Sequence, residues 1–528
     1  MTTRSRWRPQ DIAVLAQGAA TLVYAASDTF ADVDLWWHLR LGDDIWARGG
    51  LPWRDIYSYL SKDGPYTNHE WLAELMMSRA FAWGSDAGLV LLKLLLTFGI
   101  AGLLVRHLRS SGATLLASVL IGVTSILLFL PGFGTVRPQQ FSYLLFTVTL
   151  LLLAATADRP RVGWWLPVVM AVWVNLHGAV LTGLAVVIAW WVAERCVSLF
   201  TGTSARLGVL QVLASFAALI VNPWGPAILE FLRGAVSARP ELTEWNPIEF
   251  AGLEGVLYGT ALLFAVLGCS GRWRPRVPAL VVVASTALAP LLARRHLPFF
   301  VLATAVLAGP AMVRHVHDVV AARWPAGVAR HEGPSWRWPV VSVLFVEAAL
   351  LFALSVPRIR CITVEAQHYP IAAVTTLKAA GATGRIATFF DWGGFVLDTL
   401  GPELQVSMDP RRETVYGAEA YGINEQFTLG LGDWDALLVR EPRPDLALVS
   451  KAFPTFNLMR SHPGWSLVVE DQGGGLFVRE DSKVAAAVRH AAASVVPPEA
   501  HCFAAARAWL GGSTPRPRAI LGAAWPHP

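Results

Sequence analysis

Charged residues are scarce in this sequence. Only 15% of its 528 residues are Asp, Glu, Lys or Arg, whereas 54% are hydrophobic, and its mean hydropathy is +0.46. Soluble domains carry far more charge, about a quarter of their residues. The scarcity excludes a soluble globular protein, and it makes the net charge of +5 a weak reason to expect nucleic-acid binding. The composition predicts a polytopic membrane protein.

Cysteine is also scarce, and the four cysteines lack the CxxC spacing that is typical of metal sites and redox motifs. The spacing leaves open whether Cys361 and Cys502 pair. A cleavable signal peptide is not indicated either. The first apolar run follows Arg4, Arg6 and Arg8, but no small-residue cleavage pattern comes after it. We expect this run to be a retained membrane anchor.

Long apolar runs are what the sequence has in abundance. A membrane-spanning helix needs roughly 17 to 25 mostly apolar residues, and about eleven segments qualify. Basic residues collect in alternate connecting segments, as the positive-inside rule requires for a cytoplasmic N-terminus. We therefore expect a mainly α, polytopic fold. The expected spans cover residues 11–27, 88–105, 112–131, 141–157, 164–177, 179–195, 207–222, 255–270, 277–293, 297–314 and 339–356.

An odd number of spans places the C-terminal region outside the cytoplasm. Short β-rich runs in that region alternate with Gly, Pro and Asp, and a GGG turn predicts a hairpin. The pattern predicts a small extracytoplasmic α/β domain. The expected division is a transmembrane domain over 1–356 that includes an outer loop at 28–87, the α/β domain over 357–483, and an Ala-rich helix with a disordered tail over 484–528.

The densest charge in the chain lies in the outer loop, in ADVDLWWHLRLGDD (31–44). Asp32 and Asp34 are separated by one residue, so in an extended segment both carboxylates point the same way. Two adjacent acids can bind a divalent cation, or one of them can act as a general base. The alternative is a solvated pair that caps an interfacial helix. Two such helices are expected in this loop, over 34–47 and 68–83.

The order of these features resembles the GT-C superfamily of membrane glycosyltransferases, which take sugars from polyprenyl-phosphate carriers. The shared features are a cytoplasmic N-terminus, one span, D-x-D at the outer face, a two-helix loop containing GLPWRD, many further spans and an outer C-terminal domain. The chain is most similar to bacterial family-39-type members and more distantly to oligosaccharyltransferase catalytic subunits. The resemblance implies that Asp34 or Asp32 deprotonates the acceptor or helps to hold a metal. The common Asp-Glu pair of the family is absent here, which leaves open which acid is the base. Glu70, in the second expected loop helix, is the next candidate for base or metal ligand, and an exposed helical acid is the alternative.

Basic side chains on the outer side are candidates for binding the phosphate of the donor. In ARRHLPFF, Arg294, Arg295 and His296 break the charge rule that the other short loops obey. Guanidinium groups bind phosphate through charge-assisted bonds, whereas contact with anionic lipid headgroups is the alternative. Arg137 and Lys93 are further candidates, and for both of them snorkelling to the interface is the alternative.

Other polar and aromatic residues are candidates for substrate contact. FFDWGG (389–394) resembles the Trp-Trp-Asp-x-Gly motif with which oligosaccharyltransferases bind an acceptor hydroxyl, although a strand that ends in a Gly turn explains it equally well. Tryptophan rings can stack on sugars or anchor at the interface. The candidates are His69, Asn175, His177, Trp224, Trp245 and Asp391.

The resemblance thus implies an inverting glycosyltransferase, which we expect in the bacterial inner membrane. We expect it to move a sugar from a polyprenyl-phosphate or polyprenyl-diphosphate donor to a glycan, lipid or protein acceptor outside the cytoplasm. A first-loop Asp is the expected base, and the cofactor expectation is a divalent cation, Mg²⁺ or Mn²⁺, or none. Membrane lipids are expected partners, and nucleic acid is not. The alternatives are a transporter or flippase without chemistry, and a non-catalytic envelope-assembly protein.

Overall fold

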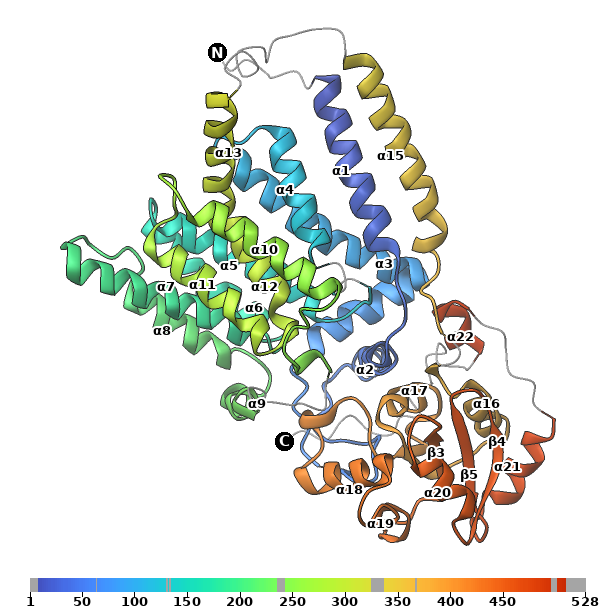
Figure 1. Ribbon diagram of the computed structural model, residues 1–528. Helices are drawn as coiled ribbons and strands as arrows, with labels where there is room; N and C mark the ends of the chain where they lie inside the picture. The colour runs from blue at the N-terminus through green and yellow to red at the C-terminus, as the bar shows by residue number, and fades with distance from the viewer. Residues whose placement is uncertain are drawn as a thin grey trace. The chain divides into compact units, whose positions relative to one another are not determined.

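The computed structural model divides into two compact units (Figure 1). The helical unit comprises Met1–Asp28, Leu91–Gly134 and Pro138–Ile359, and the sheet unit comprises Thr29–Val90, Thr135–Arg137 and Arg360–Pro528. The disordered tail expected within 484–528, in STPRPRAILGAAWPHP (513–528), lies outside the described residues. The structure describes residues 8–62, 64–129, 132, 134–234, 243–323, 337–365, 368–494 and 501–509.

The helical unit is built from apolar helices around a core of aliphatic and aromatic side chains that includes Phe146, Trp173 and Phe300. In Figure 1, α1 and α15 run side by side, and they contact each other extensively. The helices that lie wholly in this unit are α1 (Pro9–Ser27), α4 (Leu115–Leu127), α5 (Gln139–Thr156), α6 (Trp165–Trp173), α7 (Val180–Thr201), α8 (Val209–Ala217), α9 (Ile228–Gly234), α10 (Leu253–Cys269), α11 (Val277–Leu288), α12 (Leu297–Ala303), α13 (Gly309–Arg323) and α15 (Arg337–Ile359).

Several of the described helices are long and apolar enough to cross a membrane, and the protein is a multi-pass membrane protein. A bent pair of helices, Val209–Ile220 with Gly225–Gly234, would add one more span. The count of about eleven spans is not confirmed, because some expected spans are short helices, such as the nine-residue α6. The 5 helices that qualify are Trp71–Ser110, Gln139–Thr156, Val180–Thr201, Arg294–Val319 and Trp338–Ile359.

The longest helix, α3 (Trp71–Ser110), contributes to both units and is broken at Ser85. Ser85 has φ 52° and ψ −139°, and left-handed φ values are uncommon for residues other than glycine. The loop helix expected over 68–83 lies before this break, and the span expected over 88–105 lies after it. The sequence therefore predicted both parts of α3 but not their joining into one element.

The sheet unit contains a five-stranded mixed sheet in the order β2-β1-β3-β5-β4. Strands β2, β1 and β3 are parallel, and β5 is antiparallel to both β3 and β4. The predicted α/β domain and the β4–β5 hairpin around GGG are confirmed. The strands are β1 (Gly384–Thr388), β2 (Leu404–Val406), β3 (Leu446–Ser450), β4 (Trp465–Glu470) and β5 (Gly474–Arg479).

Helices cover this sheet, and one of them, α17 (Phe390–Leu400), packs closely on α2 (Val33–Arg48). Gly394 permits this approach, and Gly393 permits the close approach of α17 to the segment after β2. An added Cβ would lie 2.0 Å from the Met408 carbonyl oxygen at Gly393 and 3.1 Å from Trp37 Cδ1 at Gly394. The alternative that FFDWGG forms a Gly turn after a strand is wrong, because both glycines lie inside a helix. The other helices of the unit are α16 (Ile371–Ala379), α18 (Ala418–Leu429), α19 (Ala436–Val439), α20 (Thr455–Ser461), α21 (Ala485–Ala492) and α22 (Phe503–Trp509).

Candidate functional site

Asp32 and Asp34 lie where α2 begins. Asp32 is the N-cap residue, and its Oδ1 accepts a hydrogen bond from the Leu35 backbone N–H at 3.0 Å. Asp34 lies in the first turn, where its Oδ1 accepts a hydrogen bond from Trp37 Nε1 at 3.3 Å. Asp32 and Asp34 do not share an extended segment, because the helix expected over 34–47 already begins at Val33. The capping role is confirmed for Asp32.

One arginine joins the two acids. Arg137 donates through Nε to Asp32 Oδ2, and its Nη2 lies 3.0 Å from Asp34 Oδ2. The side chains of Asp32, Asp34 and Arg137 are 8%, 23% and 25% exposed. We call these three residues the acid–arginine junction. A planar guanidinium suits this arrangement because it can donate to two carboxylates at once.

A third carboxylate, that of Asp391, lies near the junction, in the first turn of α17. Burial raises the pKa of Asp391 to about 6, and the positive charge of Arg137 partly opposes that rise. Burial also raises the pKa of Tyr369, with smaller contributions from the negative charges of Asp32, Asp34 and Asp391. Asp391 therefore lies close enough to the junction for its charge to interact with that of Arg137.

A second polar cluster lies beside the junction. Its centre is His38, whose Nδ1 lies 3.4 Å from Glu74 Oε1, and both residues are buried. Asn68 fixes this carboxylate, because its Nδ2 donates to Glu74 Oε2 at 2.6 Å. Burial, followed by the nearby charge of Arg137, lowers the pKa of His38 well below its usual value. The imidazole is therefore neutral, with a ring nitrogen able to accept a proton or bind a metal.

Glu70 completes a group that could hold a metal ion. His38, Glu70 and Glu74 each offer one ligand atom, and these atoms lie within 4.8 Å of one another. A neutral imidazole with two carboxylates is a common donor set for divalent transition metals. The Asn68 amide orients Glu74 as an outer-shell partner would. These observations fit a divalent cation. His69, which was predicted to contact substrate, lies next to this group, with its Nε2 3.5 Å from Glu70 Oε1.

Two of the basic residues predicted to bind phosphate in the helical unit, Arg294 and Arg295, are paired with acids. Arg294 lies between two glutamates, and Arg295 pairs with a third and lies 4.6 Å over the ring of Trp245. The glutamates thus neutralise the positive charge of Arg294 and Arg295. This pairing is a second explanation, besides phosphate binding, for their departure from the positive-inside rule. The partners are Glu249 at 2.7 Å and Glu254 at 3.3 Å for Arg294, and Glu244 at 3.0 Å for Arg295.

His177 has a defined tautomer in the break between α6 and α7. Its Nδ1 accepts the Ala179 backbone N–H at 3.1 Å, so the ring proton of the neutral form lies on Nε2. Ser142 Oγ lies 2.9 Å from the same Nδ1 and accepts a hydrogen bond from Trp173 Nε1 at 2.7 Å. This buried network presents the Nε2–H of His177 as a hydrogen-bond donor.

The remaining predicted residues of the helical unit have separate environments. Asn175 Nδ2 donates to the carbonyls of Ala171 and Val221, both at 2.8 Å. Lys93 is fully buried in α3. Trp224 is half-buried, and His296 ends a 3₁₀ turn that precedes α12. These environments do not test the predicted roles of the four residues, which stay predictions.

Sequence reasoning missed three polar side chains in the sheet unit: His38, Asn68 and Glu74. Two spacings carried a signal for them. His38 follows Asp34 by one helical turn, and Glu74 follows Glu70 by one turn, so each pair shares a helix face. The contact between His38 and Glu74 itself joins two helices and has no local signature.

Comparison with known proteins shows that the chain has a known fold. No family model and no curated protein matches the chain. Among solved structures, the archaeal oligosaccharyltransferase AglB from Archaeoglobus fulgidus, in complex with an inhibitory peptide and a dolichol-phosphate, is 13% identical with a TM-score of 0.53; the match covers 84% of this chain and 70% of that one.

Two further structures are similar. ArnT from Cupriavidus metallidurans, bound to undecaprenyl phosphate, is 14% identical with a TM-score of 0.52, covering 89% of this chain and 98% of that one. The arabinofuranosyltransferase AftD from Mycobacteria is 16% identical with a TM-score of 0.50, covering 89% of this chain and 42% of that one. The chain is thus similar to integral-membrane glycosyltransferases. Its fold is the GT-C fold, with a distant likeness to oligosaccharyltransferases.

Proposed function

We propose that the protein is a glycosyltransferase that moves a sugar from a polyprenyl-phosphate or polyprenyl-diphosphate to an acceptor, with inversion. The observation that carries the proposal is the acid–arginine junction at the start of α2. Structural neighbours in complex with dolichol-phosphate and undecaprenyl phosphate support a lipid-linked donor.

Asp34 is the proposed base. Its side chain is 23% exposed, against 8% for Asp32, so Asp34 is the more accessible carboxylate. Asp32 already accepts the N-cap hydrogen bond of α2. The acceptor oxygen attacks the anomeric carbon, its proton passes to Asp34, and the bond from that carbon to the phosphate oxygen breaks. Arg137 holds the carboxylate in place, which reduces the cost of orienting the reactants.

Asp391 is the proposed acceptor contact. With its pKa at about 6, the side chain is mostly ionised at pH 7 and can accept a hydrogen bond from an acceptor hydroxyl. His69 is proposed to contact substrate from the second loop segment. For the donor phosphate, the proposed contacts are Arg294, Arg295, His296 and Lys93, because bound phosphate carries a developing charge that cations stabilise.

A divalent cation is proposed to bind His38, Glu70 and Glu74. The imidazole ligand favours Mn²⁺ over Mg²⁺ among the two ions expected, because Mg²⁺ prefers oxygen ligands. When bound, such an ion supplies positive charge near the reacting groups. The chain's own contribution is to keep Glu74 oriented through Asn68.

The protein is proposed to lie in a bacterial inner membrane, with the sheet unit on the extracytoplasmic side. Its Cys361 and Cys502 form a disulfide, and disulfides persist mainly in oxidising compartments. The two free cysteines, Cys196 and Cys269, belong to the helical unit. This distribution supports the orientation expected from the positive-inside rule.

A transfer assay tests the function. The purified full chain, reconstituted in vesicles with membranes of the source organism as acceptor, is given a panel of polyprenyl-phosphate sugars with and without a chelator. We expect one donor to be consumed and its sugar to appear in product, with transfer restored by Mn²⁺ after chelation. Accumulation of intact donor in the opposite leaflet without product would contradict the proposal in favour of a flippase.

A further inference from the structure

The last described segment, residues 501–509, returns to the part of the sheet unit that carries α2. Cys502 is joined to Cys361 by a disulfide. Backbone bonds flank it, from the Phe503 N–H to the Ile362 carbonyl at 2.8 Å and from the Val364 N–H to the His501 carbonyl at 2.9 Å. The ring of Phe503 packs 4.5 Å from that of Trp36 in α2. We call residues 501–509 the clasp.

A buried carboxylate in α3 binds both backbone segments that the disulfide joins. Asp86 Oδ2 accepts the Ile362 N–H at 3.0 Å, and its Oδ1 accepts the Ala504 N–H at 2.8 Å. Asp86 is 1% exposed, so these hydrogen bonds are shielded from water. The clasp is thus tied to α3 as well as to Cys361.

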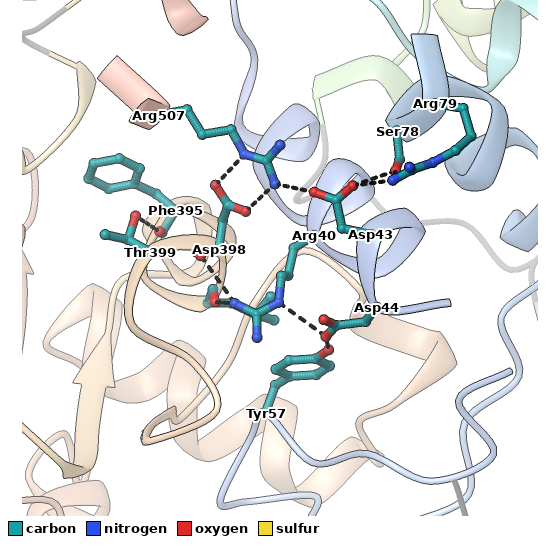
Figure 2. Close-up of polar contacts among 11 residues, drawn as sticks. Arg40, Asp43, Asp44, Tyr57, Ser78, Arg79, Phe395, Asp398, Thr399 and Arg507 are labelled. Carbon is teal, nitrogen blue, oxygen red and sulfur yellow. Dashed lines mark hydrogen bonds and ion pairs between the residues drawn. The ribbon is translucent and has the colours of Figure 1, made fainter. Parts of the chain in front are cut away.

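Arg507 connects the clasp to α2 (Figure 2). Its guanidinium makes two bonds to Asp398 of α17, at 3.0 Å and 2.8 Å, and a third to Asp43 of α2, at 3.0 Å. Asp43 also accepts from Ser78 Oγ at 2.6 Å and from Arg79 Nη2 at 2.7 Å, both on α3. One arginine therefore joins three elements, α2, α17 and α22.

The Arg507–Asp398 pair is buried, whereas the Asp43 side chain is 33% exposed, so the pair with Asp398 is the costly one to break. Arg507 and Asp398 are each 1% exposed, and a buried carboxylate that loses its partner keeps its desolvation cost. Asp43 lies about two and a half helical turns after Asp34. Because a helix is stiff over this length, a shift at Asp43 moves the start of α2 as well.

We propose that Arg507 is a positioning residue for Asp34, acting through Asp43 and α2, and that the clasp completes the site. The inference rests on the proposed function, because it takes Asp34 as the base. A misplacement of about 1 Å in a reacting group can lower a rate about 10²-fold. The C-terminal segment is then a working part of the enzyme, far along the chain from the first loop.

The test compares three variants of the full chain: Arg507→Gln, Arg507→Lys and Asp43→Asn. Asp43→Asn leaves the Arg507–Asp398 pair in place and weakens the bonds that Asp43 accepts from Arg507, Ser78 and Arg79, so it tests the hold on α2 apart from the folding of the clasp. Arg489→Gln is the matched control, because Arg489 is an exposed arginine of the same unit that bonds to Ser466.

We expect kcat to fall about 10²-fold for Arg507→Gln and at least about tenfold for Asp43→Asn, with donor KM within about twofold. Arg507→Lys should recover part of the loss, and Arg489→Gln should match wild type. Amide hydrogen exchange over residues 33–48 should speed up about tenfold in the first two variants.

The two proposals can fail separately. Wild-type kcat in both Arg507→Gln and Asp43→Asn overturns the positioning role while the transfer function stands. Unchanged exchange over 33–48 also overturns it. If the wild-type protein transfers no sugar, while amide exchange over 33–48 still speeds up in the variants, the proposed function is overturned, and with it the inference.

Discussion

Two groups of arginine–carboxylate pairs in this protein differ in their surroundings: the acid–arginine junction and the pair Arg294 and Arg295 with their glutamates. The acid–arginine junction of the sheet unit has one arginine for two acids, and its acids are 8% and 23% exposed. The pair Arg294 and Arg295 in the helical unit meets three glutamates, of which Glu249 is 71% exposed. Each group carries one more negative than positive charge when all its members are ionised.

The two regions differ in the burial of their acids: Glu244, Glu249 and Glu254 are 36%, 71% and 32% exposed, whereas the arginines of both regions are 18–25% exposed. Exposed ion pairs contribute little, about 0–1 kcal/mol, whereas groups removed from water interact strongly and are poised for chemistry. The junction is also surrounded by further desolvated groups, Asp391 and His38 among them. The geometry of an ion pair therefore indicates a functional site less well than the presence of other desolvated titratable groups around it.

Replacing Arg137 should have the largest effect. Arg137→Gln leaves Asp32 and Asp34 without their shared cation, so we expect transfer to fall about 10²-fold and the thermal midpoint to drop. Arg137→Lys keeps the charge but loses the two-carboxylate geometry, and it should recover part of both. The control is Arg440→Gln, because Arg440 pairs with a carboxylate that is 76% exposed. Equal losses in the control would mean that the junction is no different from a surface pair.

The pH dependence of transfer tests Asp391. Because its pKa is raised to about 6, the carboxylate needed to accept a hydrogen bond is present above that pH and is lost as the pH falls through it. We expect kcat/KM to fall about tenfold per pH unit below 6, and Asp391→Asn to remove this step. A profile that is flat between pH 5 and pH 7 in the wild type would contradict the assignment.

Replacing Arg295 should have a smaller effect. If it helps to bind the donor phosphate, Arg295→Gln should raise donor KM about tenfold with little change in kcat, since one charge-assisted contact is lost. Arg272→Gln is the control in the same unit, because Arg272 is 73% exposed and pairs with Asp318. An unchanged KM would show that the arginine pair only holds its loop.

The packing of α17 on the segment after β2 should respond to a single methyl group. Gly393→Ala places a Cβ 2.0 Å from the Met408 carbonyl oxygen, so we expect a loss of about 1–3 kcal/mol in the free energy of unfolding. Gly422→Ala is the control in α18, where nothing lies within 4 Å of an added Cβ. That variant should gain up to about 1 kcal/mol. Thermal denaturation of both proteins measures the difference.

Local patterns predicted the strands, the GGG hairpin, the first-loop helices and the two acids, because each is encoded within a few residues. Arg137 was noticed, but its bond to Asp32 crosses 105 residues of chain. The contact between His38 and Glu74 crosses 36 residues. Such tertiary contacts leave no periodic signal in the sequence. The span count was not confirmed, since hydropathy alone does not indicate where a run breaks into shorter helices.

The two acids of the junction have different proposed roles: Asp34 is the base, and Asp32 caps α2. Single-turnover transfer and thermal denaturation of Asp34→Asn and Asp32→Asn, with Asp433→Asn as an exposed control, test these roles most directly. The prediction is a loss of about 10³-fold in rate with a near-normal midpoint for Asp34→Asn, and a lowered midpoint for Asp32→Asn. Retained transfer by Asp34→Asn would contradict the account.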